Sequence, residues 1–320
     1  MIFDDFRSMF RKVTADNTYK NPDTSHPANE IRDYASKKCT IISIVNQKGG
    51  VGKTTTCINL ASGLAKRDFK VLMIDLDPQS HASLGIDVDV YSFSTSIYDV
   101  FVKSAELENV IVPTYLKNLE IAPATSLLTG AQLEIADLLG REGILKTSIW
   151  RMLNTHAKHY DYILMDCSPS LNLLTINGLV ASQSILIPMQ PHYFSLEGMS
   201  QLFSTLKIVK ERINSDLEVL GILPTIFDSR TKMSRDMLVQ LKDYFKEKLL
   251  KTVIRMNTRL VEATAHGKSI FDYDPDSNGA KDYWNLTEEI ISLTKPEFSI
   301  KANNATVVQN GDKPNIQTPG

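Results

Sequence analysis

The chain has 320 residues, of which 42% are hydrophobic, and a formal net charge of −2. This length is enough to bury one large core, and no internal repeat is visible. A net charge so close to zero means that affinity for nucleic acid has to come from a local cluster of cations. Three scattered cysteines exclude a disulfide framework and a Cys-rich zinc site, so we expect a reduced, cytoplasmic protein. We expect no membrane span and no secretory leader, because no sufficiently long apolar run is present.

Both ends differ in composition from the centre, which predicts a single domain over residues 39–295. Residues 1–38 form an N-terminal extension, in which residues 1–13 have the apolar spacing of a short amphipathic helix and residues 17–27 read as a linker. Three roles are open for this helix: packing on the domain, docking on a partner, or resting on a membrane surface. The membrane is least favoured because Asp4 and Asp5 lie on the polar face. Residues 296–320 are polar and carry Asn, Gly and Pro, so a flexible tail is expected.

The first predicted strand, residues 41–45, leads into a glycine-rich turn and then into a helical apolar pattern at residues 57–65. A strand, a glycine-rich loop and a helix together form a phosphate-binding P-loop, in which backbone N–H groups and the helix N-terminus attract phosphate. Lys53 would reach the β- and γ-phosphates, and Thr54 would bind Mg²⁺. The predicted nucleotide-binding residues of the loop are Lys48, Gly49, Gly50, Val51, Gly52, Lys53, Thr54 and Thr55.

The usual P-loop template has glycine where this chain has Gln47, and Lys48 precedes the paired glycines. The resulting string K-G-G-V-G-K-T-T resembles the deviant loop of the ParA/MinD class of P-loop ATPases, and the resemblance covers roughly residues 40–294. It implies ATP and Mg²⁺ as cofactors and an ATP-clamped homodimer. In that dimer Lys48 would cross the interface to the partner's nucleotide, so that both Lys48 and Lys53 count as catalytic residues.

The second predicted strand, within residues 69–79, ends in Asp75-Leu76-Asp77-Pro78-Gln79. Ligands of open α/β sheets bind at this carboxyl edge. The family resemblance implies that Asp77 orients or activates the attacking water and that Asp75 lies near the Mg²⁺ shell. The alternative without a catalytic role is that the two acids cap the next helix.

A third strand is predicted at residues 118–124 and a long helix at residues 132–158. The fourth strand, within residues 160–166, ends in Asp166, as a Walker B element does, so Asp166 is the predicted Mg²⁺ ligand on this strand. Ser168 stands where the family has a proline, which predicts a more flexible second switch. Cys167 is interpreted as a small packing residue and not as an iron–sulfur ligand.

Two more strands are predicted, at residues 183–191 and 217–225, with helices at residues 173–179 and 196–213. Strands that alternate with helices indicate an α/β fold: a mainly parallel, twisted sheet with helices on both faces.

Cations gather in the last third of the chain, in the loop at residues 228–235 and at residues 246–259. Such a patch can be a solvated face, or it can bind the phosphate backbone of DNA without reading its sequence. The family resemblance favours DNA, with Asn257 near the adenine pocket; in the family segment Arg255 replaces a proline and Met256 an arginine. The predicted DNA-binding residues are Arg230, Lys232, Arg235, Lys251, Arg255 and Arg259.

The leading hypothesis is a ParA-like ATPase that forms an ATP-dependent dimer on nucleoid DNA. It would partition a chromosome or plasmid with a ParB-like partner and turn over slowly until stimulated. One alternative keeps the ATPase but gives it a protein cargo, such as a chemoreceptor array or a microcompartment. A MinD-like, membrane-associated division regulator is disfavoured by the polar C-terminal residues. A non-hydrolytic scaffold is disfavoured by the complete set Lys48, Lys53, Thr54, Asp77 and Asp166.

Overall fold

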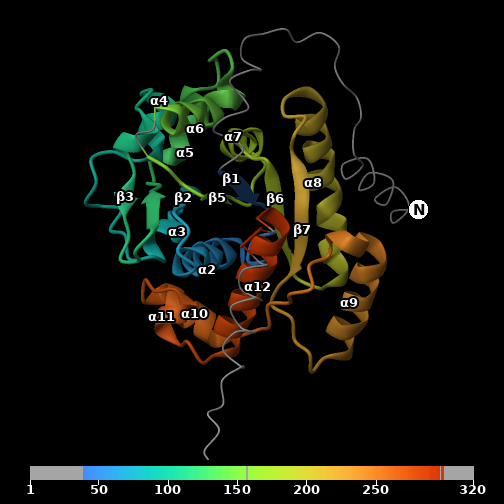
Figure 1. The fold of residues 1–320 in the computed structure, drawn as a ribbon. Coiled ribbons are helices and arrows are strands. Elements are labelled where there is room, and N and C mark those ends of the chain that lie inside the picture. The colour runs from blue at the N-terminus through green and yellow to red at the C-terminus, as the bar shows by residue number, and fades with distance from the viewer. Residues whose placement is uncertain (1–38, 156–157, 296, 299–320) are drawn as a thin grey trace, which may run out of the picture.

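The computed structural model describes residues 39–155, 158–295 and 297–298, and Figure 1 labels its elements. The predicted amphipathic helix and linker within residues 1–38, and residues 299–320 of the predicted tail, lie outside the described residues.

A seven-stranded sheet forms the centre of the molecule, in the order β3-β4-β2-β5-β1-β6-β7. Neighbouring strands pair in parallel, except that β3 runs antiparallel to β4. The strands are β1 Thr40–Ile44, β2 Val71–Leu76, β3 Val112–Pro113, β4 Leu119–Ala122, β5 Tyr162–Cys167, β6 Ser184–Met189 and β7 Glu218–Pro224. The predicted fold class is therefore confirmed, as are all six predicted strands.

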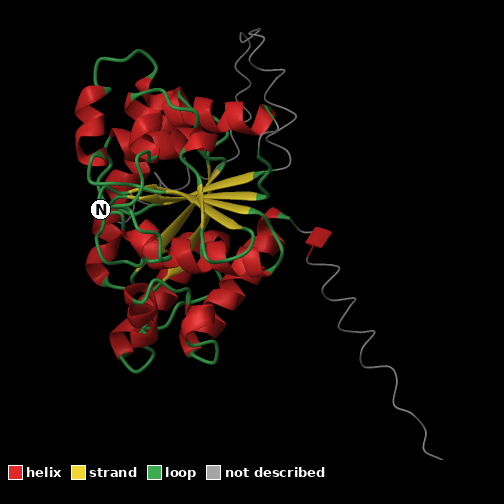
Figure 2. Cartoon of the chain, turned by 90° about the vertical axis from the view of Figure 1, so that its left-hand side faces the viewer, coloured by secondary structure: helices red, strands yellow, loops and turns green. Residues whose placement is uncertain are grey.

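Helices cover both faces of the sheet, so the molecule has three layers (Figures 1 and 2). One face is covered by α4 Ile97–Val102, α5 Leu128–Glu134, α6 Ile144–Asn154, α7 Leu173–Ala181, α8 Tyr193–Arg212 and α9 Lys232–Phe245. The other face is covered by α2 Lys53–Lys66, α3 His81–Leu84, α10 Thr258–Ala265, α11 Ile270–Tyr273 and α12 Asn278–Thr294. Among the described residues, no helix has both the length and the hydropathy needed to cross a bilayer.

The central strands explain why three acids meet at one edge. Every residue of β2 and β5 is buried, as expected for strands covered on both faces, so their apolar runs hold them in the middle of the sheet. The parallel register then places Asp166 of β5 beside Asp75 of β2 on one side and Ile44 of β1 on the other. The carboxyl ends of the three strands, and the loop after β1, thus form one edge.

The predicted helix over residues 132–158 is wrong. The chain forms α5, then the short 3-10 helix η3 at Arg141–Gly143, and then α6. Gly140 has a φ of 74°, which a right-handed helix does not allow, so the helix breaks there. The two-residue strand β3 and helix α12 are further elements that the sequence analysis did not predict.

The two edges of the sheet differ. At one edge β3 ends in Pro113, which has no N–H to donate. At the other, residues 249–256, here called the strip, follow the 3-10 helix η4 at Lys246–Lys248 and lie along β7. Leu250 N donates to Ile222 O at 2.9 Å, and Ile254 N donates to Pro224 O at 2.8 Å.

Candidate functional site

The loop between β1 and α2 has the geometry of a phosphate cradle. Gly50 and Gly52 have φ angles of 72° and 83°, in the left-handed region that favours glycine. A Cβ added at Gly49, Gly50 or Gly52 would meet no atom within 4 Å, so the cradle is open to a ligand. Asn46 holds the loop at its base, accepting from Lys48 N at 2.9 Å and donating to Pro188 O at 2.7 Å.

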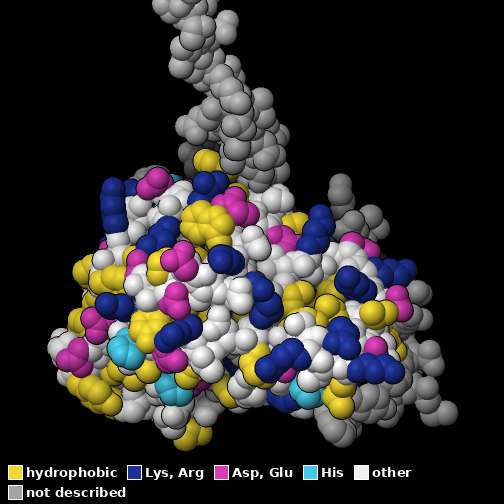
Figure 3. All heavy atoms as spheres, turned by 90° about the horizontal axis from the view of Figure 1, so that it is seen from below, with side chains coloured by type: hydrophobic (Ala, Val, Ile, Leu, Met, Phe, Trp, Pro, Cys, Tyr) yellow, Lys and Arg dark blue, Asp and Glu magenta, His cyan; other side chains and the backbone are white. Residues whose placement is uncertain are grey.

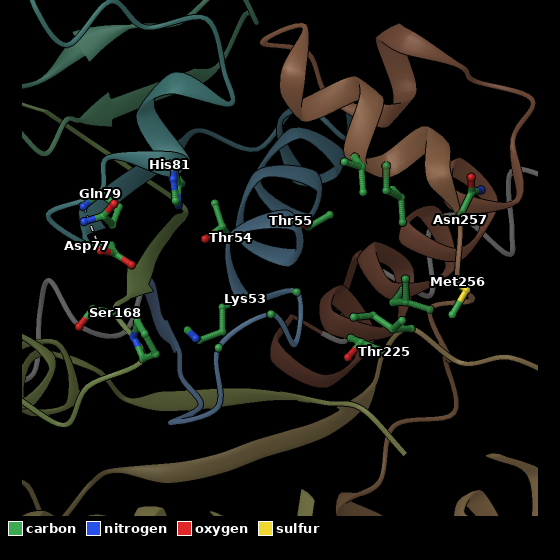
Figure 4. A pocket seen from close by; sticks show the side chains of 18 of the residues that line it. Lys53, Thr54, Thr55, Asp77, Gln79, His81, Ser168, Thr225, Met256 and Asn257 are labelled. Carbon is green, nitrogen blue, oxygen red and sulfur yellow. Dashed lines mark hydrogen bonds between the residues drawn. The ribbon is translucent and has the colours of Figure 1, made fainter. Parts of the chain in front are cut away.

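Lys53 begins α2 and points into this cradle (Figure 4). Its residue surface is only 7% exposed, and its Nζ donates to Lys48 O at 3.3 Å. Burial lowers the pKa of Lys53, with the nearby Asp166 acting in the opposite direction. A buried ammonium with one carbonyl acceptor at 3.3 Å among the described residues fits an anionic ligand such as a phosphate.

Thr54 and Asp166 fit a magnesium ion. Thr54 Oγ1 donates to Asp166 Oδ2 at 2.7 Å. Asp166 Oδ1 is fully buried and has no hydrogen-bond partner in the part of the chain that the structure describes. Burial, and then the neighbouring Asp75, raise the pKa of Asp166 well above its usual range, so a cation at this point would offset the cost of its charge. Mg²⁺ is usually held by one or two protein oxygens together with phosphate and water, which matches this pair.

Asp75 lies beside Asp166 but is fully hydrogen-bonded to the protein. Its Oδ1 accepts from Asp77 N at 3.1 Å, and its Oδ2 accepts from Ser83 N at 3.0 Å and Ser83 Oγ at 2.7 Å. Burial raises the pKa of Asp75 to about 6. In this structure Asp75 orders the loop after β2 and the start of α3, and its proximity to Mg²⁺ stays a prediction.

Asp77 is partly exposed and lines the cavity that also contains Lys53 and Thr54. Its Oδ1 accepts from Gln79 N at 3.0 Å. The local turn therefore uses one carboxylate oxygen and leaves the other available to a ligand or water.

The cavity has a volume of about 860 Å³ and extends from the P-loop to the residues before α10. Asp77, Gln79 and His81 lie on one side of Lys53 and Thr54, and Met256 and Asn257 lie on the other (Figure 4). The first side is polar, whereas the second is largely apolar and includes Ile254, Met256, Leu260 and Val261. A pocket with a cationic end and an apolar end suits a nucleotide, whose phosphates and planar base differ in the same way.

Of two further predicted site residues, Asn257 lines the cavity and Lys48 does not. Lys48 is exposed, in contrast to the buried Lys53 of the same loop. Asn257 lines the cavity and caps α10, since its Oδ1 accepts from Arg259 N at 2.9 Å. Ser168, from which extra mobility was expected, is buried and its Oγ lies 3.0 Å from Ser170 Oγ.

Two lining residues that the sequence analysis missed tie the P-loop to distant elements. Thr225, just after β7, donates from Oγ1 to Val51 O at 2.8 Å. Tyr283 of α12 lies with its hydroxyl 3.1 Å from Thr56 Oγ1 in the first turn of α2. Thr225 ends a predicted strand at the ligand-binding edge, which is a signal that could have identified it. Nothing in the local sequence marks Tyr283.

The six predicted DNA-binding cations lie between the end of β7 and the first turn of α10, but three of them are ion-paired within the chain. Arg230 pairs with Asp228, Arg255 with Asp282, and Arg259 with Glu262 and Asp274. Arg235 donates to Ser229 O at 2.6 Å. Lys232 and Lys251 are exposed, and no side-chain partner of either is found among the described residues. Figure 3 shows the face of the molecule where α9 to α12 lie, on which Lys and Arg are interspersed with acidic and apolar side chains.

Comparison with known proteins agrees with this geometry. Residues 39–219 match the family model described as "AAA domain". The chain is 45% identical over 252 residues to the sporulation initiation inhibitor protein Soj of Bacillus subtilis, covering 79% of this chain and 98% of that protein. It is 41% identical over 257 residues to the chromosome partitioning protein ParA of Myxococcus xanthus, covering 80% of this chain and 89% of that protein.

A solved structure extends the similarity to the fold. The septum site-determining protein MinD of Pyrococcus horikoshii, complexed with Mg-ADP, superposes with a TM-score of 0.64 at 26% identity, covering 80% of this chain and 98% of that chain. The P-loop with its preceding Lys48, the acids at the ends of β2 and β5, and these similarities lead to one assignment. The chain belongs to the ParA/Soj/MinD family of P-loop ATPases and is a homologue of the chromosome-partitioning ATPases Soj and ParA.

Proposed function

We propose that this protein is an ATP-dependent switch that partitions DNA. It binds ATP with Mg²⁺, closes into a homodimer, associates with nucleoid DNA without sequence preference, and is released when a ParB-like partner stimulates a slow hydrolysis. The names of two relatives, the chromosome partitioning protein ParA and the chromosome-partitioning ATPase Soj of Treponema pallidum, support the role in partitioning, and the site supports the chemistry.

The observation that carries the proposal is the contrast between the two lysines of the loop. Lys53 is buried and directed into the cradle, so it serves the nucleotide of its own subunit. Lys48 is exposed and therefore available to a second subunit. A cation lent across an interface would stabilise the charge that develops during phosphoryl transfer only when two subunits have met.

The remaining residues of the site position the reactants. Bound Mg²⁺ would neutralise charge on the β- and γ-phosphates, and Thr54 and Asp166 would hold it. Asp77, with one carboxylate oxygen available, would orient the attacking water. The glycine cradle supplies backbone N–H groups that fix the phosphates in place.

DNA binding would come from the exposed cations near α9 and the strip. Lys232 and Lys251 are the best candidates, because charges already paired within the chain contribute less to a phosphate contact. Dimerisation doubles the number of such cations on one assembly, which raises its affinity through avidity. ATP binding and DNA binding would thereby be linked.

The test is fluorescence anisotropy of a labelled random-sequence duplex, measured with ATP, with ADP and without nucleotide, at about 50 mM and about 200 mM salt. We expect binding with ATP at low salt and its loss at high salt. The double variant Lys232→Gln/Lys251→Gln should bind more weakly and with a shallower salt slope. Lys117→Gln, which changes an exposed lysine near the opposite edge of the sheet, is the matched control. Binding that ignores salt or nucleotide, or an equal loss in the control, would refute the proposed DNA surface.

A further inference from the structure

The strip is held between two elements. On one side its backbone pairs with the end of β7: Phe227 N donates to Ile254 O at 3.0 Å, and Met256 N donates to Phe227 O at 3.0 Å. On the other side it lies against α12, the last described helix. Its final residues, Ile254 to Met256, line the nucleotide cavity.

Two carboxylates of α12 clamp the strip to the helix. Glu289 accepts from Lys251 N at 2.8 Å and from Thr252 N at 2.9 Å. Asp282, seven residues earlier and therefore on the same helix face, accepts from Arg255 N at 3.0 Å. The strip has no regular ladder on this side, so these carboxylates take the place of a neighbouring strand.

The contact at Asp282 is also an ion pair with fixed geometry. Arg255 Nη2 donates to Asp282 Oδ1 at 2.6 Å, and Arg255 Nε donates to Oδ2 at 3.0 Å, the two-point arrangement that arginine makes with carboxylates. The Asp282 side chain is 7% exposed and that of Arg255 is 41% exposed. A buried carboxylate without its cation would be costly, so Asp282 holds both the guanidinium and the backbone of residue 255 in one place.

This ion pair lies at the apolar end of the nucleotide cavity. Arg255 lines the cavity next to Met256 and Asn257 at its apolar end. Tyr283, the residue after Asp282, lines the same cavity and lies 3.1 Å from Thr56 of the P-loop helix. Two adjacent residues of α12 therefore make different contacts. Asp282 holds Arg255 at the apolar end of the cavity, and Tyr283 contacts the phosphate-binding helix α2.

We propose that Arg255 and Asp282 are positioning residues for the base-binding end of the cavity. Their ion pair fixes the strip where Arg255 to Asn257 enclose the base, and so it sets the affinity for nucleotide without taking part in phosphoryl transfer. This inference rests on the proposed function, because it takes ATP as the ligand. It gives Arg255 a role in the nucleotide site that differs from a DNA contact.

The test compares three ligands by isothermal titration: ATP, ADP and inorganic tripolyphosphate, which has the phosphates but no base. The variants are Asp282→Asn, which keeps the shape of the side chain, and Arg255→Met, which keeps its apolar stem. We expect each to weaken ATP and ADP about tenfold, or about 1.4 kcal/mol, and to leave tripolyphosphate unchanged. In steady-state kinetics KM should rise and kcat should stay the same. The charge swap Arg255→Asp/Asp282→Arg should regain part of the affinity for ATP.

The matched control is Glu288→Gln. Glu288 is also on α12 and is also paired with an arginine, Arg67, but neither residue lines the cavity. This variant should bind all three ligands as the wild type does. An equal loss of tripolyphosphate binding would show a general structural defect, and an unchanged ATP affinity in both test variants would remove the positioning role. A loss of DNA binding alone in Arg255→Met would assign Arg255 to DNA instead. The proposed function is tested separately, by whether the wild type binds ATP. The role of the ion pair is tested only by comparing the variants with the wild type.

Discussion

Lys53 lines the cavity, Asp166 is hydrogen-bonded to the lining residue Thr54, and both Lys53 and Asp166 are buried. Burying either charge costs free energy unless a partner compensates it. Among the described residues, Lys53 donates to one carbonyl oxygen at 3.3 Å, and Asp166 Oδ1 has no hydrogen-bond partner. At the scale of single residues, the site is therefore built for a ligand that brings an anion to the lysine and a cation to the aspartate.

Replacing Asp166 by Asn should separate nucleotide binding from magnesium. Asn keeps the size of the side chain but loses the negative charge that attracts Mg²⁺. We expect the wild type to bind a fluorescent ATP analogue at least tenfold more tightly with Mg²⁺ than with a chelator, which corresponds to about 1.4 kcal/mol. The affinity of Asp166→Asn should be the same in both conditions. Asp216→Asn, an exposed change outside the cavity, should behave as the wild type does; retention of the Mg²⁺ effect in Asp166→Asn would contradict the ligand assignment.

At the scale of elements, the P-loop helix α2 is held in place by close packing on α12. Gly63 of α2 faces Thr287 of α12, and a Cβ at Gly63 would overlap Thr287 Oγ1. Thr287 Oγ1 itself donates to Tyr283 O at 2.8 Å, so it has little freedom to move away. Glycine is required here by the approach of the two helices and not by an unusual backbone angle.

Gly63→Ala should therefore destabilise the protein. The added methyl group overpacks the helix contact, at a cost of about 1–3 kcal/mol in the free energy of unfolding. Urea denaturation followed by circular dichroism measures this cost. Thr287→Ala removes the opposing hydroxyl and methyl groups, so the double variant Gly63→Ala/Thr287→Ala should regain part of the lost free energy of unfolding. If Gly63→Ala were as stable as the wild type, or if the double variant regained nothing, the proposed overpacking between α2 and α12 would be wrong.

The strands were predictable from the sequence and several helices were not. β1, β2 and β5 are rich in Ile, Val, Leu and Met, as expected for strands covered on both faces, and such segments stand out in a sequence. The segment of α5 and α6 keeps a helical apolar spacing across Gly140, so its period alone does not reveal the break. β3 has only two residues, too few to form a pattern.

The site residues also fall into two groups, those that the sequence predicts and those that it does not. Asp77 directly follows β2, Asp166 lies at the end of β5, and the loop after β1 leads to Lys53 and Thr54, so their shared edge follows from parallel topology. Asp282 meets Arg255 across 27 residues, and Tyr283 meets Thr56 across 227. Contacts of this kind depend on how helices pack on the sheet, and no local spacing encodes them. The three ion-paired arginines illustrate the same limit, since their acidic partners are not evident from a count of charges.

At the scale of the whole molecule, Lys48 makes a prediction about assembly. If Lys48 acts on the nucleotide of a second subunit, Lys48→Gln should bind ATP with nearly unchanged affinity but fail to dimerise. Light scattering with ATP and Mg²⁺ should give a doubled mass for the wild type and a single-subunit mass for the variant. Lys117→Gln should dimerise as the wild type does. A Lys48→Gln dimer of normal stability would rule out the role in trans.

The structure of the two sheet edges affects whether further strands can pair with the sheet. Exposed strand edges offer unpaired N–H and C=O groups that can template the addition of foreign strands. Here one flank finishes in an imino acid that cannot donate, and the other is already paired with the strip. Addition of a further strand to the described sheet is thus hindered by a proline on one flank and by the strip on the other, which disfavours polymerisation through edge-to-edge pairing.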